Sequence, residues 1–227
     1  MIFNRTIELI GDEKLQKLKD STVLVLGLGG VGGSACEALA RAGVGTLVIV
    51  DEDVVDITNI NRQIVALHST IGLPKTEVMK QRINDINPDC IVHAYHTFYD
   101  KNTKVEILDR EFDFFCDCID TLTYKIDLIK DAHDRNIKII SSMGMGNKVH
   151  PEMIEIVDIR ETSHDPIARR MRSSLRKLKI YTPVPVVYSP EEPQRIDKEK
   201  RTPSSISYLP PVAGMIMASY VVNNIIE

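Results

Sequence analysis

A cluster of acidic, amide and guanidinium side chains lies between residues 51 and 63. Asp51 and Asp53 come first, and Asn59, Arg62 and Gln63 follow. A planar guanidinium such as that of Arg62 bonds phosphate oxygens in pairs and offsets their charge. A nicotinamide enzyme does not need an arginine and amides at this place, whereas a triphosphate site does. The cluster therefore favours a nucleoside-triphosphate site.

A glycine-rich turn lies just upstream, with Gly27, Gly29, Gly30 and Gly32. Glycines let the backbone turn tightly and approach a polyphosphate, while the N–H groups of a following helix face the anion. Asp51 lies 19 residues beyond Gly32, where an acidic side chain can accept hydrogen bonds from a ribose. A tight turn without a ligand would need the same glycines, so the glycines alone are a weak signal.

The elements that position these residues follow from the apolar pattern. Apolar runs at 23–26 and 46–50 predict two strands, and 35–40 predicts a helix between them. Ligands of open parallel sheets bind beyond the carboxyl ends of the strands, where the polar residues above lie. The expected fold class is therefore α/β, a Rossmann-like doubly wound mixed sheet with helices on both faces.

Other elements are predicted along the rest of the chain. We expect a helix over 4–20 with a break at Gly11, and a helix from Thr76 onward. The further predictions are strands at 90–94, 112–120 and 138–140, a helix at 125–135, an edge strand at 153–159, and a C-terminal helix packed on the sheet after 207.

With these motifs the sequence resembles the ubiquitin-activating-enzyme-like adenylation family, which includes the ThiF, MoeB and HesA proteins. The matching motifs are Gly27-x-Gly29-Gly30-x-Gly32, Asp51-x-Asp53 and Asn59-x-Asn61-Arg62-Gln63. The resemblance implies that ATP and Mg²⁺ are cofactors, and that the four glycines, Asp51, Asp53, Asn59 and Gln63 bind the nucleotide. It also implies a monovalent cation around the glycine-rich loop at 141–148.

The resemblance implies roles for residues that would act on the triphosphate. Asp120 ends an Asp-x-x-Asp motif whose last aspartate handles magnesium in the family, so Asp120 is the expected metal ligand and catalytic residue. Lys75 and Arg62 would bind phosphate oxygens. Arg5 would reach across a homodimer to the neighbour's triphosphate. Asp117 would either support Asp120 or cap a buried network, and the residues do not choose between these roles.

The cysteines limit which branch of the family is expected. They are Cys36, Cys90, Cys116 and Cys118, without a Cys-x-x-Cys pair, so thiolate zinc is excluded on ligand count. We interpret all four as buried structural thiols. No cysteine follows Cys118 to accept an acyl group. His93 and His96 lack a third metal ligand nearby, and we interpret them as strand-end residues.

Composition bounds the function classes. The 227 residues are 43% hydrophobic and 26% charged, which suits one largish soluble domain. A net charge of −4 argues against a generally basic nucleic-acid binder but allows a local basic patch. The N-terminus lacks the features of a signal peptide, and the longest apolar stretch, 212–222, is too short to span a bilayer. We expect a cytoplasmic protein with no transmembrane segment.

A basic helix is predicted beyond residue 165. Asp165 and Pro166 form a good helix start, and no acid occurs between 167 and 179. The basic residues there are Arg169, Arg170, Arg172, Arg176, Lys177 and Lys179. We expect this helix, with Lys148 and with Arg195, Lys198, Lys200 and Arg201, to bind a nucleic-acid phosphate backbone. A merely solvated basic face is the alternative.

Three downstream segments, 165–168, 186–193 and 205–214, resemble the dehydratase branch of the family. That branch adenylates the carboxylate of threonylcarbamoyladenosine in tRNA with ATP and promotes its cyclisation, releasing AMP and pyrophosphate. The resemblance covers essentially the whole chain. It implies a single ThiF-type domain over 1–227, with a nucleotide-binding half at 1–148 and a substrate-facing half at 149–227.

Two alternatives stay open from the sequence. One is an adenylating enzyme for a ubiquitin-like sulfur-carrier protein, and the other is a nucleotide-binding sensor or a dehydrogenase. A sulfur-transfer protein is a further partner to consider. The polar tract 190–205 predicts a mobile loop over or beside the site.

Overall fold

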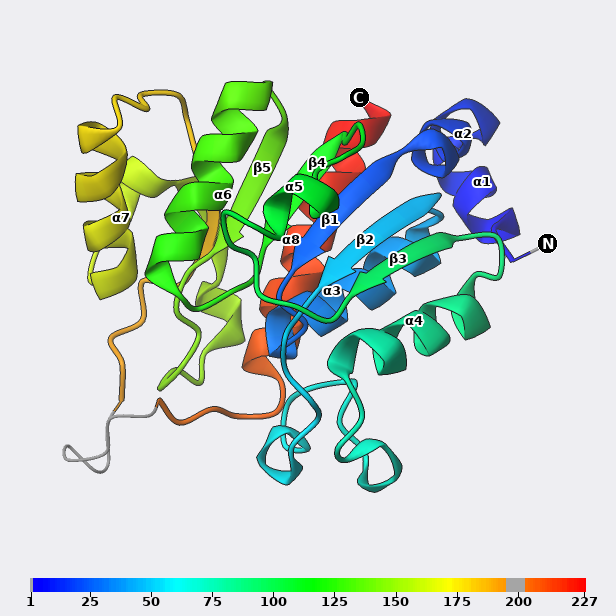
Figure 1. The fold of residues 1–227 in the computed structure, drawn as a ribbon, viewed down its shortest axis with the longest axis horizontal. Helices are drawn as coiled ribbons and strands as arrows, with labels where there is room; N and C mark the ends of the chain where they lie inside the picture. The colour runs from blue at the N-terminus through cyan, green and yellow to red at the C-terminus, as the bar shows by residue number, and fades with distance from the viewer. Residues whose placement is uncertain (1, 195–202) are drawn as a thin grey trace.

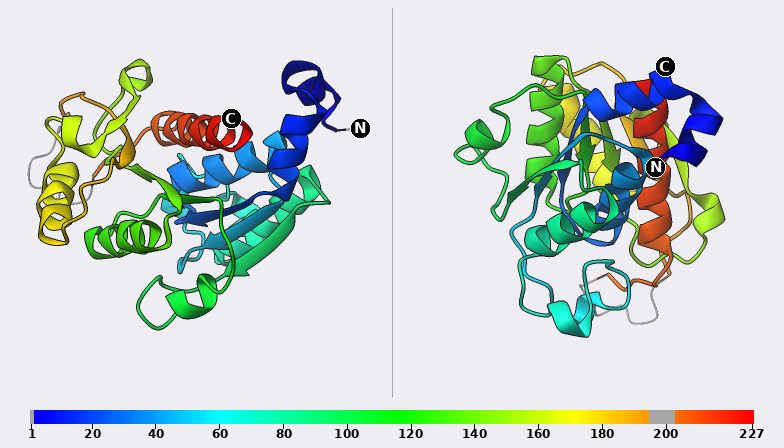
Figure 2. Two further views of the ribbon diagram at one scale, coloured as in Figure 1. Left: turned by 90° about the horizontal axis from the view of Figure 1, so that it is seen from above. Right: turned by 90° about the vertical axis from the view of Figure 1, so that its right-hand side faces the viewer.

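The computed structural model describes residues 2–194 and 203–227. Within these ranges one seven-stranded sheet has the strand order β3-β2-β1-β4-β5-β7-β6. Helices cover both of its faces (Figures 1 and 2). All neighbouring strands pair in parallel except β6, which pairs antiparallel with β7 at the edge. The prediction of a doubly wound mixed sheet is therefore confirmed.

The strands are short and the helices vary in length. The strands are β1 Thr22–Leu26, β2 Thr46–Val50, β3 Ile91–Tyr95, β4 Phe114–Asp117, β5 Lys138–Ser142, β6 Glu155–Asp158 and β7 Pro185–Tyr188. The helices are α1 Asn4–Ile10, α2 Asp12–Asp20, α3 Gly30–Ala42, α4 Lys75–Ile86, α5 Lys104–Ile107, α6 Leu122–Arg135, α7 Pro166–Lys177 and α8 Leu209–Ile226. Short 3₁₀ turns are η1 Ile57–Asn59, η2 His68–Thr70, η3 Pro151–Met153 and η4 Ile159–Glu161.

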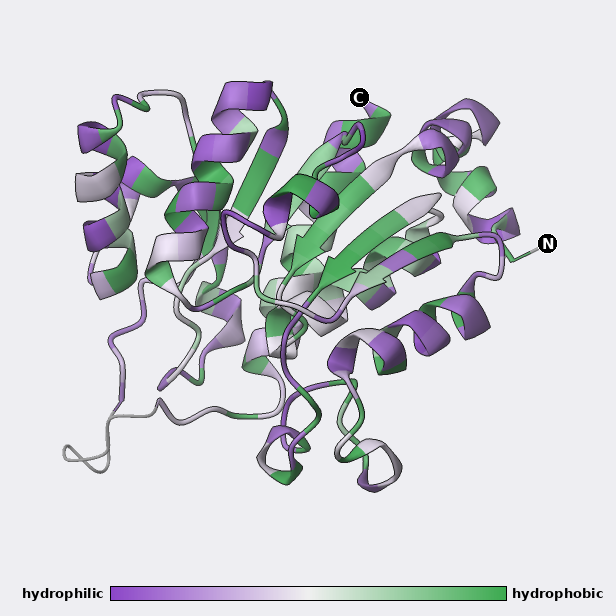
Figure 3. Ribbon diagram, in the orientation of Figure 1, coloured by the Kyte–Doolittle hydropathy of each residue, from purple (hydrophilic) through white to green (hydrophobic). Residues whose placement is uncertain are grey.

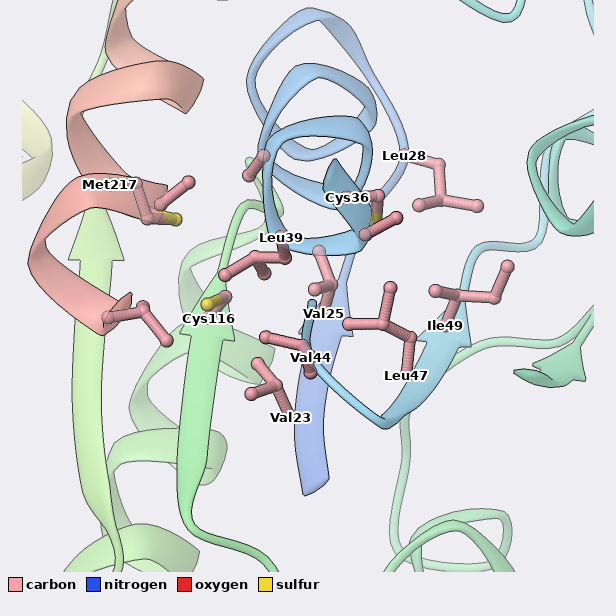
Figure 4. Packing of buried hydrophobic residues seen from close by; sticks show 14 of the residues in the cluster. Val23, Val25, Leu28, Cys36, Leu39, Val44, Leu47, Ile49, Cys116 and Met217 are labelled. Carbon is pink, nitrogen blue, oxygen red and sulfur yellow. The ribbon is translucent and has the colours of Figure 1, made fainter. Parts of the chain in front are cut away.

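Strand β1 lies in the interior of the sheet, between β2 and β4, and is buried on both faces. Val23 and Val25 face the core beneath α3 and α8, whereas Leu24 and Leu26 face the core beneath α6. Figure 4 shows Val23 and Val25 packed with Leu39 of α3 and with Met217 of α8 nearby. A strand covered on both faces reads as a continuous apolar run, which explains why the sequence pattern located β1 and β2 correctly. Figure 3 shows the same concentration of apolar residues on the central strands.

The turn after β1 depends on glycine at two positions. Gly27 has φ +91°, a left-handed conformation that side chains rarely adopt. A Cβ on Gly32 would lie 1.8 Å from the carbonyl oxygen of Gly27, so only glycine allows α3 to begin this close to the turn. The helix consequently starts at Gly30, several residues before the apolar segment at 35–40 that predicted it.

The C-terminal part extends the same sheet. Strand β6 is the antiparallel edge strand expected near 153–159. The Asp165 carboxylate accepts a hydrogen bond from the backbone N–H of Ala168, which caps α7 as predicted. The break at Gly11 separates α1 from α2, as the sequence indicated.

Helix α8 packs on the sheet, as the sequence predicts, and lies beside α3 (Figure 2). Tyr220 of α8 contacts Phe114 of β4, and α8 also contacts β5 and β7. A Cβ on Gly214 would lie 2.2 Å from the carbonyl oxygen of Val31, so the two helices approach at backbone distance. Among the described residues, α8 is the one helix long and apolar enough to cross a membrane. Buried core helices have the same composition, and eight residues of α8 are buried.

Candidate functional site

A cavity of about 340 Å³ opens where β1, β2 and β4 end. Strand β1 lies between β2 and β4, so the cavity is at the point where the strand order reverses, the usual ligand site of doubly wound sheets. The structure brings together most of the residues that the sequence singled out. Those that line the cavity are Gly27, Gly29, Gly30, Asp51, Asp53, Asn59, Arg62, Gln63, Lys75 and Asp120.

Two of the predicted residues lie outside the cavity wall. Gly32 is in the first turn of α3, where its lack of a side chain lets the helix approach Gly27. Arg5 is exposed on α1, at the N-terminal side of the molecule, and it does not line the cavity.

Asp51 organises the turn between β1 and α3. One carboxylate oxygen accepts the backbone N–H of Leu28 at 2.6 Å, and the other accepts the N–H of Asp53 at 2.8 Å. Burial raises the pKa of Asp51, against the lowering effect of Lys75 and these two N–H groups. Each oxygen keeps a further lone pair, so the carboxylate can still accept a bond from a ligand hydroxyl.

Arg62 and Lys75 are the two cationic side chains among the residues that line the cavity. Lys75 opens α4, and its buried ammonium lies 2.7 Å from Asp53 Oδ2 and 4.0 Å from Asp51 Oδ1. The Arg62 guanidinium donates to Thr58 O at 3.1 Å and to Asn61 Oδ1 at 2.8 Å. Both cations therefore reach the cavity from the segments after β2, where an anionic group would meet them.

Asn59 and Gln63 occupy the same wall. Asn59 Oδ1 accepts the backbone N–H of Asp56 at 3.1 Å and shapes the short turn η1. Gln63 is buried, and its Oε1 has no hydrogen-bond donor among the described residues. Buried acceptors are nearly always hydrogen-bonded in folded proteins, so Gln63 Oε1 is suited to accept a hydrogen bond from a ligand.

The two acids of the Asp-x-x-Asp motif lie in opposite environments. Asp120 is exposed and lines the cavity. Asp117 is fully buried at the end of β4, forms an ion pair with Lys125 at 2.9 Å, and accepts a hydrogen bond from the Ser141 hydroxyl. Asp117 therefore belongs to a buried network.

The same network anchors the loop that carries Asp120. Lys125 Nζ donates to the carbonyl oxygens of Ile119 and Ser142, each at 2.9 Å. Three oxygen acceptors thus satisfy an ammonium that is 1% exposed. Because Ile119 directly precedes Asp120, this buried lysine fixes the start of the Asp120 peptide.

Sequence reasoning missed several cavity residues. Burial, with the carboxylates of Asp53, Asp51 and Asp120, raises the pKa of Glu52 to about 7. Glu52 stands between two acids that the motif singled out, but the burial that raises its pKa most, and the smaller contribution of Asp120, arise only in the folded chain. Tyr99 and Tyr124 also line the cavity, although no motif marks either residue.

Cys118 is the one cysteine among the cavity-lining residues. Its thiol donates to Met217 Sδ at 3.4 Å, and burial raises the pKa of the thiol well above its ordinary value. A protonated thiol is a poor nucleophile. Cys36, Cys90 and Cys116 are buried as predicted, whereas Cys118 is half-buried.

Only some of the residues of the predicted basic surface are exposed. Exposed basic residues on α7 are Arg169, Arg170, Arg176 and Lys177. Arg172 instead turns one amino group to the carbonyl oxygens of Ile159 and Thr162, each at 3.1 Å. Lys148 is buried and donates to Ser189 O at 2.7 Å, so it does not offer a free cation to RNA.

Some predictions cannot be placed. Part of the tract 190–205 lies outside the described residues, and with it Arg195, Lys198, Lys200 and Arg201.

The glycine-rich loop at 141–148 does not line the cavity. His96 contacts the carbonyl oxygen of Glu52 at 2.8 Å through Nε2. In the part of the chain that the structure describes, no three His, Cys, Asp or Glu side chains group closely enough to hold a metal ion.

Comparisons with known proteins agree with this geometry. The ThiF family pattern matches residues 3–227. The tRNA threonylcarbamoyladenosine dehydratase of Bacillus subtilis (strain 168) is 46% identical over 240 residues, covering 99% of this chain and 94% of that protein. The dehydratase of Escherichia coli (strain K12) is 37% identical over 174 residues, covering 77% of this chain and 65% of that protein.

A solved structure extends the likeness to three dimensions. The crystal structure of the E. coli tRNA N6-threonylcarbamoyladenosine dehydratase in complex with ATP has a TM-score of 0.90 and 31% identity, covering 98% of this chain and 93% of that chain. Another structure of that enzyme is a complex with AMP. A relative that binds both ATP and AMP has a fold that covers almost all of this chain.

Proposed function

The chain belongs to the ThiF family, and we propose that it is an ATP-dependent dehydratase acting on threonylcarbamoyladenosine in tRNA. It adenylates the side-chain carboxylate of that nucleoside and promotes cyclisation, releasing pyrophosphate and AMP. The observation that carries the proposal is the similarity to a dehydratase over 99% of the chain. The glycine turn, cations and carboxylates at the strand ends supply the matching site.

The proposed reaction needs no nucleophile from the enzyme. A carboxylate oxygen of the substrate attacks the α-phosphorus of ATP, and the bond from that phosphorus to pyrophosphate breaks. A nucleophile in the same modified side chain then attacks the acyl carbon. The former carboxylate oxygen leaves with AMP, and the proton of the nucleophile passes to solvent, so the nucleoside loses the elements of one water. Ring closure gains from proximity, with effective molarities of roughly 10⁵ M or more when groups are well oriented.

Arg62 and Lys75 bind the phosphates in this proposal. Both are cationic and line the cavity, and the Lys75 ammonium needs only to leave Asp53 to meet a phosphate oxygen. Negative charge that develops on departing pyrophosphate is stabilised by cations already in place. Asp51 accepts the ribose hydroxyls, and the turn at Gly27 to Gly30 receives the phosphates at the start of α3.

Asp120 fits a magnesium ion. Its exposed carboxylate lines the cavity and forms no ion pair with another described residue. Mg²⁺ commonly takes one or two carboxylates together with nucleotide phosphate oxygens and water, so Asp120 can be its main protein ligand. When bound, the ion supplies positive charge that offsets the phosphates.

The alternative function, adenylation of a ubiquitin-like sulfur carrier, has less support. A thiol-dependent member of that branch needs a reactive cysteine, whereas the pKa of the Cys118 thiol is raised by burial and the other three thiols are buried. We propose further that residues 149–227 face the substrate and that the protein acts in the cytoplasm. A monovalent cation near 141–148 and a sulfur-transfer partner stay expectations from the family resemblance.

Pyrophosphate release tests the proposed function against its alternative. We expect the purified protein to release pyrophosphate and AMP from ATP when tRNA carrying threonylcarbamoyladenosine is added, and not with unmodified tRNA. Stimulation by a ubiquitin-like protein ending in Gly-Gly, with none by the modified tRNA, would instead support the carrier-protein alternative. The tRNA dependence should weaken as salt rises.

Arg5 is expected to act in the neighbouring subunit of a homodimer. Arg5→Ala and Asp120→Ala homodimers should each have little activity. In a mixed dimer, the protomer with an intact Asp120 would receive Arg5 from its partner, which completes one site. Equal co-expression with two affinity tags should therefore restore about a quarter of wild-type activity to the unfractionated mixture. If Arg5 serves its own chain, no mixed dimer contains a complete site, and activity stays at the level of the separate variants.

A further inference from the structure

A second cavity, of about 260 Å³, lies beside α7. It is bounded by η4, by one side of α7 and by the segment 180–184 that leads into β7. Three buried apolar residues line it: Leu175, Ile180 and Val184. Figure 1 shows α7 at the outer edge of the molecule, beyond α6 and away from β1 and β2. None of its lining residues belongs to the nucleotide cavity.

An exposed aromatic ring stands at the rim of this cavity. Tyr181 is 68% exposed, and its hydroxyl makes no hydrogen bond with another described residue. The preceding chain turns through Lys179, which has φ 58°, a conformation that non-glycine residues rarely adopt. A ring that is exposed beside an apolar cavity offers a flat face to a planar ligand.

The surroundings of the cavity are basic. Arg172 and Arg176 are part of its lining, one turn apart on α7. Two acids lie at η4: Asp158 is paired with Arg160, and Glu161 is exposed. Exposed basic residues continue along the same helix, which has no acid of its own: Arg169, Arg170 and Lys177. The region is therefore locally positive in a chain of net charge −4.

We propose that this cavity takes one unstacked base of the substrate tRNA. Proteins that read single-stranded RNA stack bases on aromatic rings and meet the flanking phosphates with arginine. The cavity is smaller than the roughly 300–1,000 Å³ of cofactor and drug sites, which favours a single heterocycle. Tyr181 stacks on the base, and Arg176 contacts the adjoining backbone. The inference rests on the proposed function and adds a second point of tRNA contact outside the reaction site.

Tryptophan fluorescence tests the contact directly, because the chain contains no tryptophan. A Tyr181→Trp variant has one indole at the cavity, and a Val105→Trp control has one on α5, where Val105 is 70% exposed. We expect tRNA to quench the emission of the Tyr181→Trp variant saturably, since a stacked base contacts its ring, and to leave the control unchanged. Tight tRNA binding without quenching, or equal quenching in both variants, would overturn the proposal.

Affinity measurements separate stacking from folding effects. Tyr181→Ala should weaken tRNA binding about 5- to 150-fold, whereas Tyr181→Phe keeps the ring and should bind like wild type. An unchanged affinity in Tyr181→Ala would contradict the inference. If wild type binds tRNA through this cavity but removes no water from its nucleoside, the proposed function fails and the RNA site stands. If wild type removes water while Tyr181→Ala binds normally, only the site is wrong.

Discussion

Asp120→Asn is expected to lower the kcat of ATP-dependent water loss about 100- to 1000-fold, the range seen when one preorganised electrostatic contact to a transition state is removed. Asparagine keeps the size of the side chain and loses the charge that would hold Mg²⁺ beside the phosphates. Since Asp120 is exposed and forms no ion pair with a described residue, its replacement should leave folding intact. Steady-state rates over a range of Mg²⁺ concentrations measure the effect.

A matched control is Asp109→Asn, which removes an exposed carboxylate outside the nucleotide cavity. The control should keep wild-type kcat and the wild-type requirement for Mg²⁺. An Asp120→Asn enzyme with an unchanged kcat, in a preparation with the wild-type melting temperature, would refute the central role assigned to Asp120.

Lys125→Met is expected to destabilise the fold by about 3–5 kcal/mol, because it leaves the buried Asp117 carboxylate without its counter-ion. The carbonyl oxygens of Ile119 and Ser142 also lose a donor. For a chain of this size the change corresponds to a fall in Tm of about 6–20 °C. Urea unfolding and calorimetry measure the loss of stability.

The partly exposed ion pair between Lys104 and Asp131 serves as a control for the buried pair. These side chains are 31% and 14% exposed and lie 2.8 Å apart, so Lys104→Met should cost no more than about 1 kcal/mol. Similar costs for the two lysine variants would show that burial does not govern the Lys125 network. Asp117→Asn in the Lys125→Met background removes the unpaired charge and should recover part of the stability.

Apolar patterns located the central strands because each of those strands is buried on both faces. The runs at 23–26 and 46–50 therefore matched β1 and β2 closely. The apolar segment at 35–40 predicts a start of α3 that is several residues too late. Glycine has a low helix propensity, and the glycines from Gly30 to Gly33 are helical where the chain packs closely around them. The position of α8 along α3 likewise depends on contacts across the fold that no local pattern records.

The candidate site was predictable where a motif places residues at or soon after strand ends, as for Asp51 and Asp120, or in the segment after β2, as for Arg62. It was not predictable where distant segments meet. Tyr99 joins the cavity from the chain after β3, and Lys125 reaches Asp117 from α6. The prediction that Lys148 binds RNA was wrong, because the sequence does not show that its ammonium is buried against the Ser189 carbonyl.

We propose that this chain activates a carboxylate in tRNA by cleaving ATP between its α- and β-phosphates. Mass spectrometry of nucleosides, prepared under mild conditions, tests it most directly. With Mg²⁺ and tRNA carrying threonylcarbamoyladenosine, the nucleoside should lose the mass of one water when ATP or its β,γ-methylene analogue is present. It should stay intact with the α,β-methylene analogue. An unchanged nucleoside in a preparation that binds ATP, or conversion supported by the α,β-methylene analogue, would contradict the claim.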